Sequence, residues 1–354
     1  MTQVARARSS SGDGPARPLT SFAVARAAGV SQSTVSLVMS GKAAGRVSAA
    51  TQALVETTVR RLGYQPNVSA RTLRTGMART LALAVPNVQQ PFFGQLLVAA
   101  EHAAREHDYA VILIDTTTDV VWTDRLLGML RSGLVAGCIV YAGDDKCDQR
   151  LLPARERILF VEAEDTRNSS VDLDVGGGMH AVVQHLIGLG HRRIGYFAAG
   201  YPKGTYRRRY ASFRDELKQH DLPHCPGWRT SATFELEEAT LAARTLLAQA
   251  DISALFCDDD LLAGAAYRAA RNLGIVIPAQ LSVVGFNDLE MARLLSPELT
   301  TVAIPVDAVG RTAVERLLAQ LQRPTEMTAA PFVAALELRV RASTAPPGDG
   351  DPAK

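Results

Sequence analysis

The chain has 354 residues, of which 47% are hydrophobic and 21% charged, so it is long and apolar enough to bury the cores of two or three globular domains. Residues up to Arg79 include eleven Lys or Arg and only two Asp or Glu, whereas the rest of the chain is net acidic and the overall charge is +2. A basic N-terminal segment before an acidic body argues against a single uniform domain and is typical of a nucleic-acid-binding module joined to a domain with another task.

Residues 1–18 are rich in Ser, Gly, Arg and Pro and are predicted to be a disordered tail. Residues 19–64 are predicted to form three short helices. Thr20 or Ser21 can cap the first helix, which Gly29 ends, and Ser31 can cap the second. The third helix is expected to follow Ser48 and end at Gly63. Its buried side is expected to consist of Ala53, Leu54, Val59 and Leu62.

The second of these helices is predicted to present an uncharged face to the outside. Val35 and Val38 are three residues apart and would pack on the first helix. The opposite face then carries Gln32, Ser33, Ser36 and Leu37. Small side chains that offer hydrogen bonds fit the major groove of DNA and can contact base edges there. The alternative is a plain helical hairpin, which the basic charge of this segment disfavours.

This segment resembles the DNA-binding head of the lac repressor family of bacterial transcription regulators. The resemblance is carried by Ala25-Arg26-Ala27-Ala28-Gly29-Val30-Ser31, Thr34-Val35-Ser36, Val47-Ser48 and Leu62-Gly63-Tyr64-Gln65-Pro66-Asn67. It implies that Gln32 and Ser33 read bases, with Ser36 and Leu37 on the same face. It also implies phosphate contacts by Ser31, Thr34, Ser40 and Lys42. Leu37 stands where the family very often has arginine, so the family's usual operator preference is not carried over at that position.

Residues 65–79 are predicted to be a hinge helix or linker. By itself, the stretch from Asn67 to Arg74 is a short and poorly stabilised helix or a flexible linker. The resemblance implies a hinge helix that folds on DNA and pairs with its twin in a homodimer. Leu73 matches the family's minor-groove wedge, and Ala70 matches the small residue beside it.

Residues 80–341 are predicted to form an α/β body of two lobes, because apolar runs alternate with helical stretches and the series restarts after Asp174. The first lobe is expected to comprise residues 80–172 and 305–323, and the second residues 173–304 and 324–341. The motifs Pro86-Asn87, Leu189–Ile194, Leu281–Asp288 and Leu299–Val302 are also similar to the family. They imply a periplasmic-binding-protein-like fold that closes on a small ligand. Residues 342–354 are expected to be a second disordered tail and lack the leucine heptads of a tetramer.

Ligands of open parallel sheets bind beyond the carboxyl ends of the strands, so polar and aromatic residues just after the strands are the candidates for ligand contacts. Asp115 is one such residue, and Lys203 and Thr205 fall where purine-responsive members of the family contact their effector. The predicted effector-binding residues are Asn87, Gln90, Phe92, Tyr141, Glu162, Lys203, Thr205, Arg209, Phe234, Asp259 and Asn287. Such a set suits a polyhydroxylated or heterocyclic compound. The family commonly has Asn at position 259 and Asp at position 287, which leaves the identity of the ligand open.

The sequence contains no Ser-His-Asp arrangement, phosphate loop or dinucleotide fingerprint, so neither catalysis nor a cofactor is predicted. The four cysteines have no zinc spacing, and Asp258-Asp259-Asp260 alone does not make a metal site. No signal core or long apolar run is present. An enzyme and a secreted sugar-binding protein are therefore the weaker alternatives. We expect a cytoplasmic, homodimeric repressor that binds operator DNA under the control of a sugar or sugar derivative, or alternatively of a purine or nucleoside.

Overall fold

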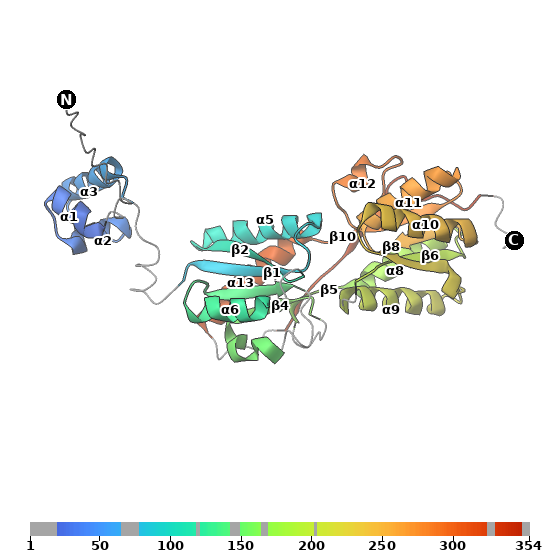
Figure 1. The fold of residues 1–354 in the computed structure, drawn as a ribbon, viewed down its shortest axis with the longest axis horizontal. Helices are drawn as coiled ribbons and strands as arrows, with labels where there is room; N and C mark the ends of the chain where they lie inside the picture. Colours follow the sequence, from blue (N-terminus) through green and yellow to red (C-terminus); the bar gives the residue numbers. More distant parts are fainter. Residues whose placement is uncertain are drawn as a thin grey trace, which may run out of the picture. The chain divides into compact units, whose positions relative to one another are not determined.

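The computed structural model describes residues 20–64, 78–117, 121–141, 149–163, 169–201, 204–323 and 330–348. The chain divides into two compact units after Met77, inside the stretch predicted to be the hinge. Figure 1 shows a helical first unit and a second unit that contains two sheets. Within the described residues, every helix is too short or too polar to span a membrane.

The first unit contains three helices among its described residues: α1 (Ser21–Ala28), α2 (Gln32–Met39) and α3 (Ala49–Leu62). Each begins at a predicted cap, because the side chains of Thr20, Ser31 and Ser48 accept hydrogen bonds from backbone N–H groups of the first turn. Gly29 ends α1 with φ 65°, and Gly63 ends α3 with φ 63°. These left-handed conformations are favourable for glycine and confirm the predicted helix ends.

The core of the first unit is small and holds the three helices together. Its buried apolar members are Val24, Ala25, Ala28, Val35 and Val55. The prediction for α3 was wrong at two positions, since Ala53 is exposed and half of the Leu54 surface is accessible. Val55 and Thr58 are buried instead, because the 3.6-residue period of the helix aligns them with Val59 and Leu62 on one face.

The second unit is built on two sheets. Within the described residues, the first sheet has the spatial order β11 (Phe332–Ala334), β5 (Ser169–Leu173), β4 (Ile158–Val161), β3 (Gly137–Tyr141), β1 (Thr80–Val85) and β2 (Ala110–Asp115). The second sheet has the order β12 (Glu337–Arg339), β10 (Thr300–Ala303), β9 (Ser282–Asn287), β8 (Ala254–Cys257), β6 (Ile194–Ala199) and β7 (Arg229–Ala232). Neighbouring strands are parallel except β12, which runs antiparallel to β10.

Helices cover both faces of each sheet, as alternation of strands and helices requires. The helices of the first lobe are α5 (Pro91–Glu106), α6 (Trp122–Arg131) and α13 (Val306–Gln322), with the 3₁₀ turn η1 (Leu152–Arg157). Those of the second lobe are α8 (Val175–Gly188), α9 (Gly204–Gln219), α10 (Leu236–Gln249), α11 (Asp260–Leu273) and α12 (Met291–Leu294), with η3 (Pro226–Trp228). In β1, Leu81 and Leu83 belong to the core beneath α5 and α13, whereas Ala82 belongs to the core beneath α6. The predicted two-lobed α/β architecture is confirmed.

The C-terminal part of the chain departs from the predicted boundaries. Residues 324–341 were assigned to the second lobe, but β11 pairs with β5 in the first sheet, and only β12 belongs to the second. Residues 342–354 were predicted to be a disordered tail, yet the described part of this segment, through Gly348, packs on the second lobe. The Ser343 side chain is fully buried and donates to the Val283 carbonyl at 2.6 Å. Its burial explains why the segment is held despite its Pro- and Gly-rich composition.

Candidate functional site

Helix α2 carries the predicted DNA-reading face. Ser31, Gln32 and Ser33 are exposed, whereas Ser36 and Leu37 are half-buried. Ser31 Oγ lies 2.7 Å from Ser33 Oγ, and the Gln32 amide donates to Ser21 Oγ on α1 at 2.8 Å. These contacts fix the first turn of α2 against α1 while its outer surface remains uncharged.

The remaining head residues of the prediction flank α2. Thr34 is half-buried, and its Oγ1 lies 2.9 Å from Ser31 Oγ. The Ser40 hydroxyl donates to the Leu37 carbonyl. Lys42 is exposed in the loop that follows α2. Asn67, Ala70 and Leu73, the predicted hinge contacts, lie outside the described residues, so their roles stay predictions.

A cavity of about 300 Å³ lies between the two lobes of the second unit. Residues from both lobes line it at the carboxyl ends of the strands, as the topology of parallel sheets predicts. The predicted residues among its lining are Asn87, Gln90, Phe92, Tyr141, Glu162, Thr205, Arg209, Phe234 and Asn287. Lining residues that were not predicted to contact the ligand are Pro86, Phe93, Thr116, Thr117, Tyr201, Tyr206 and Ile304. Thr116, Thr117 and Tyr201 follow the ends of β2 and β6, so the same positional rule could have found them.

Two of the predicted candidates, Lys203 and Asp115, are not part of the described cavity lining. Lys203 lies outside the described residues. Asp115 does not line the cavity; its carboxylate accepts hydrogen bonds from the backbone N–H groups of Thr117 at 2.7 Å and Val88 at 3.3 Å. It therefore stabilises the loops beside the cavity.

Three lining residues have backbones in the left-handed region. The φ angles are 59° for Asn87 after β1, 50° for Glu162 after β4 and 107° for Asn287 at the last position of β9. Such conformations are unfavourable for residues other than glycine and are concentrated at functional sites, where the surroundings hold them in place. The shared strain at three strand ends supports the assignment of this cavity as a binding site.

Arg209 is the one cation at the cavity among the described lining residues, and it is 4% exposed. One terminal nitrogen donates to the Asp258 carbonyl at 2.5 Å, and the guanidinium carbon lies 3.4 Å from the centre of the Phe286 ring. Its Nε has no hydrogen-bond partner. A buried donor without a partner costs free energy, so the surroundings of Arg209 leave one polar group unsatisfied.

Glu162 joins the two lobes beneath the cavity. Its carboxylate accepts hydrogen bonds from the Tyr141 hydroxyl at 2.6 Å and from the Thr205 hydroxyl, and it forms an ion pair with Arg208 at 3.4 Å. Arg208 also contacts Asp172 of the first lobe at 3.2 Å. Burial, together with the nearby negative charge of Glu162, raises the pKa of Tyr141, so its hydroxyl remains a donor.

Asp259, predicted to contact the ligand, is not among the residues that line the cavity. Its side chain is fully buried. It caps α11, where it accepts a hydrogen bond from the Leu261 N–H at 2.8 Å. The same carboxylate accepts hydrogen bonds from the side-chain amides of Gln90 and Asn287, which do line the cavity.

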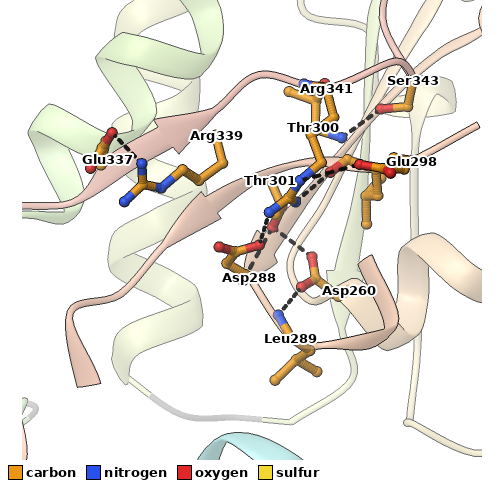
Figure 2. A network of polar contacts seen from close by, with 11 residues as sticks. Asp260, Asp288, Leu289, Glu298, Thr300, Thr301, Glu337, Arg339, Arg341 and Ser343 are labelled. Atoms are coloured by element: carbon orange, nitrogen blue, oxygen red, sulfur yellow. Dashed lines mark hydrogen bonds and ion pairs between the residues drawn. The ribbon is translucent and has the colours of Figure 1, made fainter. Parts of the chain in front are cut away.

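A network of polar contacts supports the turn that follows Asn287. Figure 2 shows Asp260 between the backbone N–H of Leu289 and the Thr301 hydroxyl, which donate to it at 2.7 and 2.6 Å. Figure 2 also shows Arg341 beside Asp288, with the charged atoms 2.5 Å apart. Asp288 is itself left-handed, with φ 52°. The C-terminal segment therefore helps to hold the strained end of β9.

Burial raises the pKa of Asp260 from about 3.8 to about 8. Between these values the folded protein holds a proton that the unfolded chain releases, so this group lowers the free energy of unfolding as the pH rises. We expect the melting temperature of the wild type to fall relative to that of Asp260→Asn between about pH 5 and about pH 8. Asp215→Asn, at an exposed carboxylate of α9, is the control. A melting-temperature difference that does not change with pH would contradict the assignment.

Two sequence families match the chain. Residues 23–67 match the bacterial regulatory proteins of the lacI family, and residues 183–344 match the periplasmic binding protein-like domain. The described residues contain no group of three or more His, Cys, Asp or Glu that could hold a metal ion.

Relatives of known name align with most of the chain. The ribose operon repressor of Haemophilus influenzae is 30% identical over 86% of this chain and 92% of its own length. The transcriptional repressor PurR of Aliivibrio salmonicida is 30% identical over 84% of this chain and 91% of its own length. The lac repressor dimer bound to operator and the anti-inducer ONPF matches with a TM-score of 0.82 and 25% identity, covering 93% of this chain and 100% of that one. The chain is therefore a member of the lacI family of DNA-binding transcription regulators, which are not enzymes, and carries a periplasmic-binding-protein-like effector domain.

Proposed function

We propose that the protein is a cytoplasmic, homodimeric repressor whose operator affinity is controlled by a sugar or sugar derivative bound between the lobes. The observation that carries this proposal is the cavity, which combines aromatic side chains with amides and a buried arginine that has an unpartnered Nε. Each head would bind one half of a pseudopalindromic operator, with the hinge helices paired at its centre. Ligand binding would change the lobe arrangement and thereby the pairing of the hinges.

The lining of the cavity supports a polyhydroxylated ligand. Phe92, Tyr206 and Phe234 offer apolar ring surfaces, and Asn87, Gln90 and Asn287 offer hydrogen bonds in several directions. Sugars combine apolar C–H faces with hydroxyl groups that both donate and accept. The similarity to a ribose operon repressor points to the same class.

A purine or nucleoside is the second candidate ligand. The same aromatic rings could stack on a heterocycle, and the similarity to PurR spans the chain as fully as the similarity to the ribose operon repressor. A solute-binding protein without a role on DNA is disfavoured by the capped helices and the uncharged outer face of α2.

Thermal-shift measurements followed by gel shifts test the proposal. The panel comprises D-ribose, D-glucose, their phosphates, hypoxanthine and guanine. We expect a sugar or sugar phosphate to raise the melting temperature in a saturable manner and to alter a gel shift with the organism's promoter DNA. Stabilisation by a nucleobase alone would favour the second candidate. The absence of any gel shift would contradict the proposed role on DNA.

An apolar groove on the second unit is the surface that we assign to the homodimer. Helices α5 and α12 and the start of α13 line it, and its most exposed apolar side chains are Leu294 (80% exposed) and Val98 (52% exposed). Exposed apolar side chains that gather along one groove are typical of protein interfaces. The resolved lac repressor dimer supports a second copy of this chain as the occupant.

Leu294→Asp is expected to separate the proposed dimer without unfolding the protomer, because the Leu294 side chain is mostly exposed. Loss of the second head should weaken operator binding by about 100-fold, since the two half-sites are no longer bound together. Sedimentation and gel-shift titrations measure both effects. Leu241→Asp, at a leucine of α10 that is 56% exposed and lies outside the groove, is the control and should remain dimeric. A dimeric Leu294→Asp variant would place the interface elsewhere.

A further inference from the structure

The Asp259 carboxylate receives three N–H donors while its own surface is fully buried. One oxygen accepts the Leu261 backbone N–H at 2.8 Å. The other accepts the side-chain amides of Gln90 at 2.5 Å and Asn287 at 2.7 Å. Gln90 precedes α5 in the first lobe and Asn287 ends β9 in the second, so one carboxylate binds an amide from each lobe.

An ionised carboxylate only accepts hydrogen bonds, so each of these amides must turn its NH₂ group toward Asp259. The carbonyl oxygen and the NH₂ group of an amide diverge from the same carbon, so the oxygen does not face the acceptor that the NH₂ group contacts. Gln90 and Asn287 line the cavity and Asp259 does not, so each amide has one end tied to Asp259 and belongs to a residue that a ligand can reach. Arg209, whose buried Nε has no partner, lines the same cavity.

We propose that Asp259 is a positioning residue that sets the hydrogen-bonding polarity of the cavity, by holding the amides of Gln90 and Asn287 so that both carbonyl oxygens accept from neighbouring hydroxyl or N–H groups of the ligand. This inference rests on the proposed function and narrows the ligand to one with two donors in reach of both lobes. It also gives a direct role to Asp259 although the residue does not touch the cavity.

The protonation of Asp259 controls this arrangement. Burial raises the pKa of Asp259 to about 7, even though hydrogen bonds from Leu261 and Gln90 and the charge of Arg209 favour the ionised form. The negative charge of Asp258 disfavours the ionised form of Asp259. The other titratable groups that interact with Asp259 are Tyr206, Cys257 and Asp260.

A protonated Asp259 has a hydroxyl that must donate to an acceptor. The two amides contact Asp259 through their NH₂ groups, so one of them would have to rotate to offer its carbonyl oxygen to this hydroxyl and would then present its NH₂ group to the cavity. The cavity would then change from two acceptors to one acceptor and one donor as the pH falls through about 7. The cavity would then favour a ligand that offers one donor and one acceptor over a ligand that offers two donors.

Side-chain amide NMR of the full-length protein, without DNA or ligand, tests the proposal. The Gln90 and Asn287 NH₂ signals are assigned by their loss in Gln90→Met and Asn287→Leu. We expect both signals of the wild type to shift together from about pH 5.5 to about pH 8.5, with one shared midpoint near pH 7. The proposal is overturned if the signals do not titrate or if they titrate separately.

Asp259→Asn should abolish this shared titration, because the carboxylate is replaced by an amide of the same shape. Asp260→Asn changes the neighbouring buried carboxylate, which contacts Thr301 and Leu289 rather than the two amides, and should retain the titration. A titration that survives in Asp259→Asn would assign it to another group and overturn the proposal. The wild-type measurement remains decisive if Asp259→Asn does not fold. Because the measurement uses no DNA, a failed gel shift would contradict the proposed function without affecting this result.

Discussion

Arg209→Lys is expected to abolish the ligand response while leaving ligand-free operator binding intact. Lysine keeps a positive charge near the buried Asp258, which limits the loss of stability. It has no planar guanidinium fork, so it cannot offer a ligand the directional hydrogen bonds that arginine offers from the lining of the cavity. We expect at least about a 100-fold weaker ligand affinity, which corresponds to roughly 3 kcal/mol. Thermal-shift titration with the compound that stabilises the wild type measures this loss.

Arg209→Ala provides the contrasting variant. It removes the charge as well as the donor and leaves Asp258 buried without its cation, so a loss of about 3–5 kcal/mol in folding free energy is expected. Arg207→Lys, at an exposed arginine of the same helix, is the matched control. A normal dose response in Arg209→Lys would show that the guanidinium group does not contact the ligand.

Local features of the fold could be predicted from the sequence because their causes lie within a few residues. A cap such as Ser31 or Ser48 accepts a hydrogen bond three residues away, and Gly29 ends its helix by its own conformation. Apolar runs such as Thr80–Val85 are long enough to identify buried parallel strands. The family resemblance then supplied the order of the domains.

Features that depend on distant partners could not be predicted in this way. The strands β11 and β12 have three residues each and are defined by pairing with β5 and β10. The segment around Ser343 is held by β9 and β10, which are remote in the sequence.

The same limit applies to the candidate site. The rule that ligands bind after parallel strands correctly identified most of the cavity lining, including Asn87, Glu162 and Asn287. It cannot distinguish a side chain that faces the cavity from one that supports it. Asp259 follows β8 as the rule requires, but capping of α11 and the amides of Gln90 and Asn287 hold it behind the surface.

Operator affinity is expected to depend steeply on salt, because the proposed contacts of α2 and its flanking loop to phosphates release bound counterions. With six to ten phosphate contacts, affinity should fall by about 10³- to 10⁵-fold between about 50 and about 200 mM salt. Lys42 is exposed beside α2, so Lys42→Gln should reduce the slope of log affinity against log salt by about one per head. Gel-shift titrations at several salt concentrations measure the slope.

Arg131→Gln is the matched control for this prediction, since it removes an equally exposed positive charge at the end of α6 in the second unit. The two variants carry the same net charge, so a non-specific effect of charge would lower both slopes alike. A lower slope in Lys42→Gln alone would assign a phosphate contact to the loop after α2. Equal slopes in both variants and the wild type would remove Lys42 from the interface, and a flat salt dependence of the wild type would contradict phosphate contacts by the head altogether.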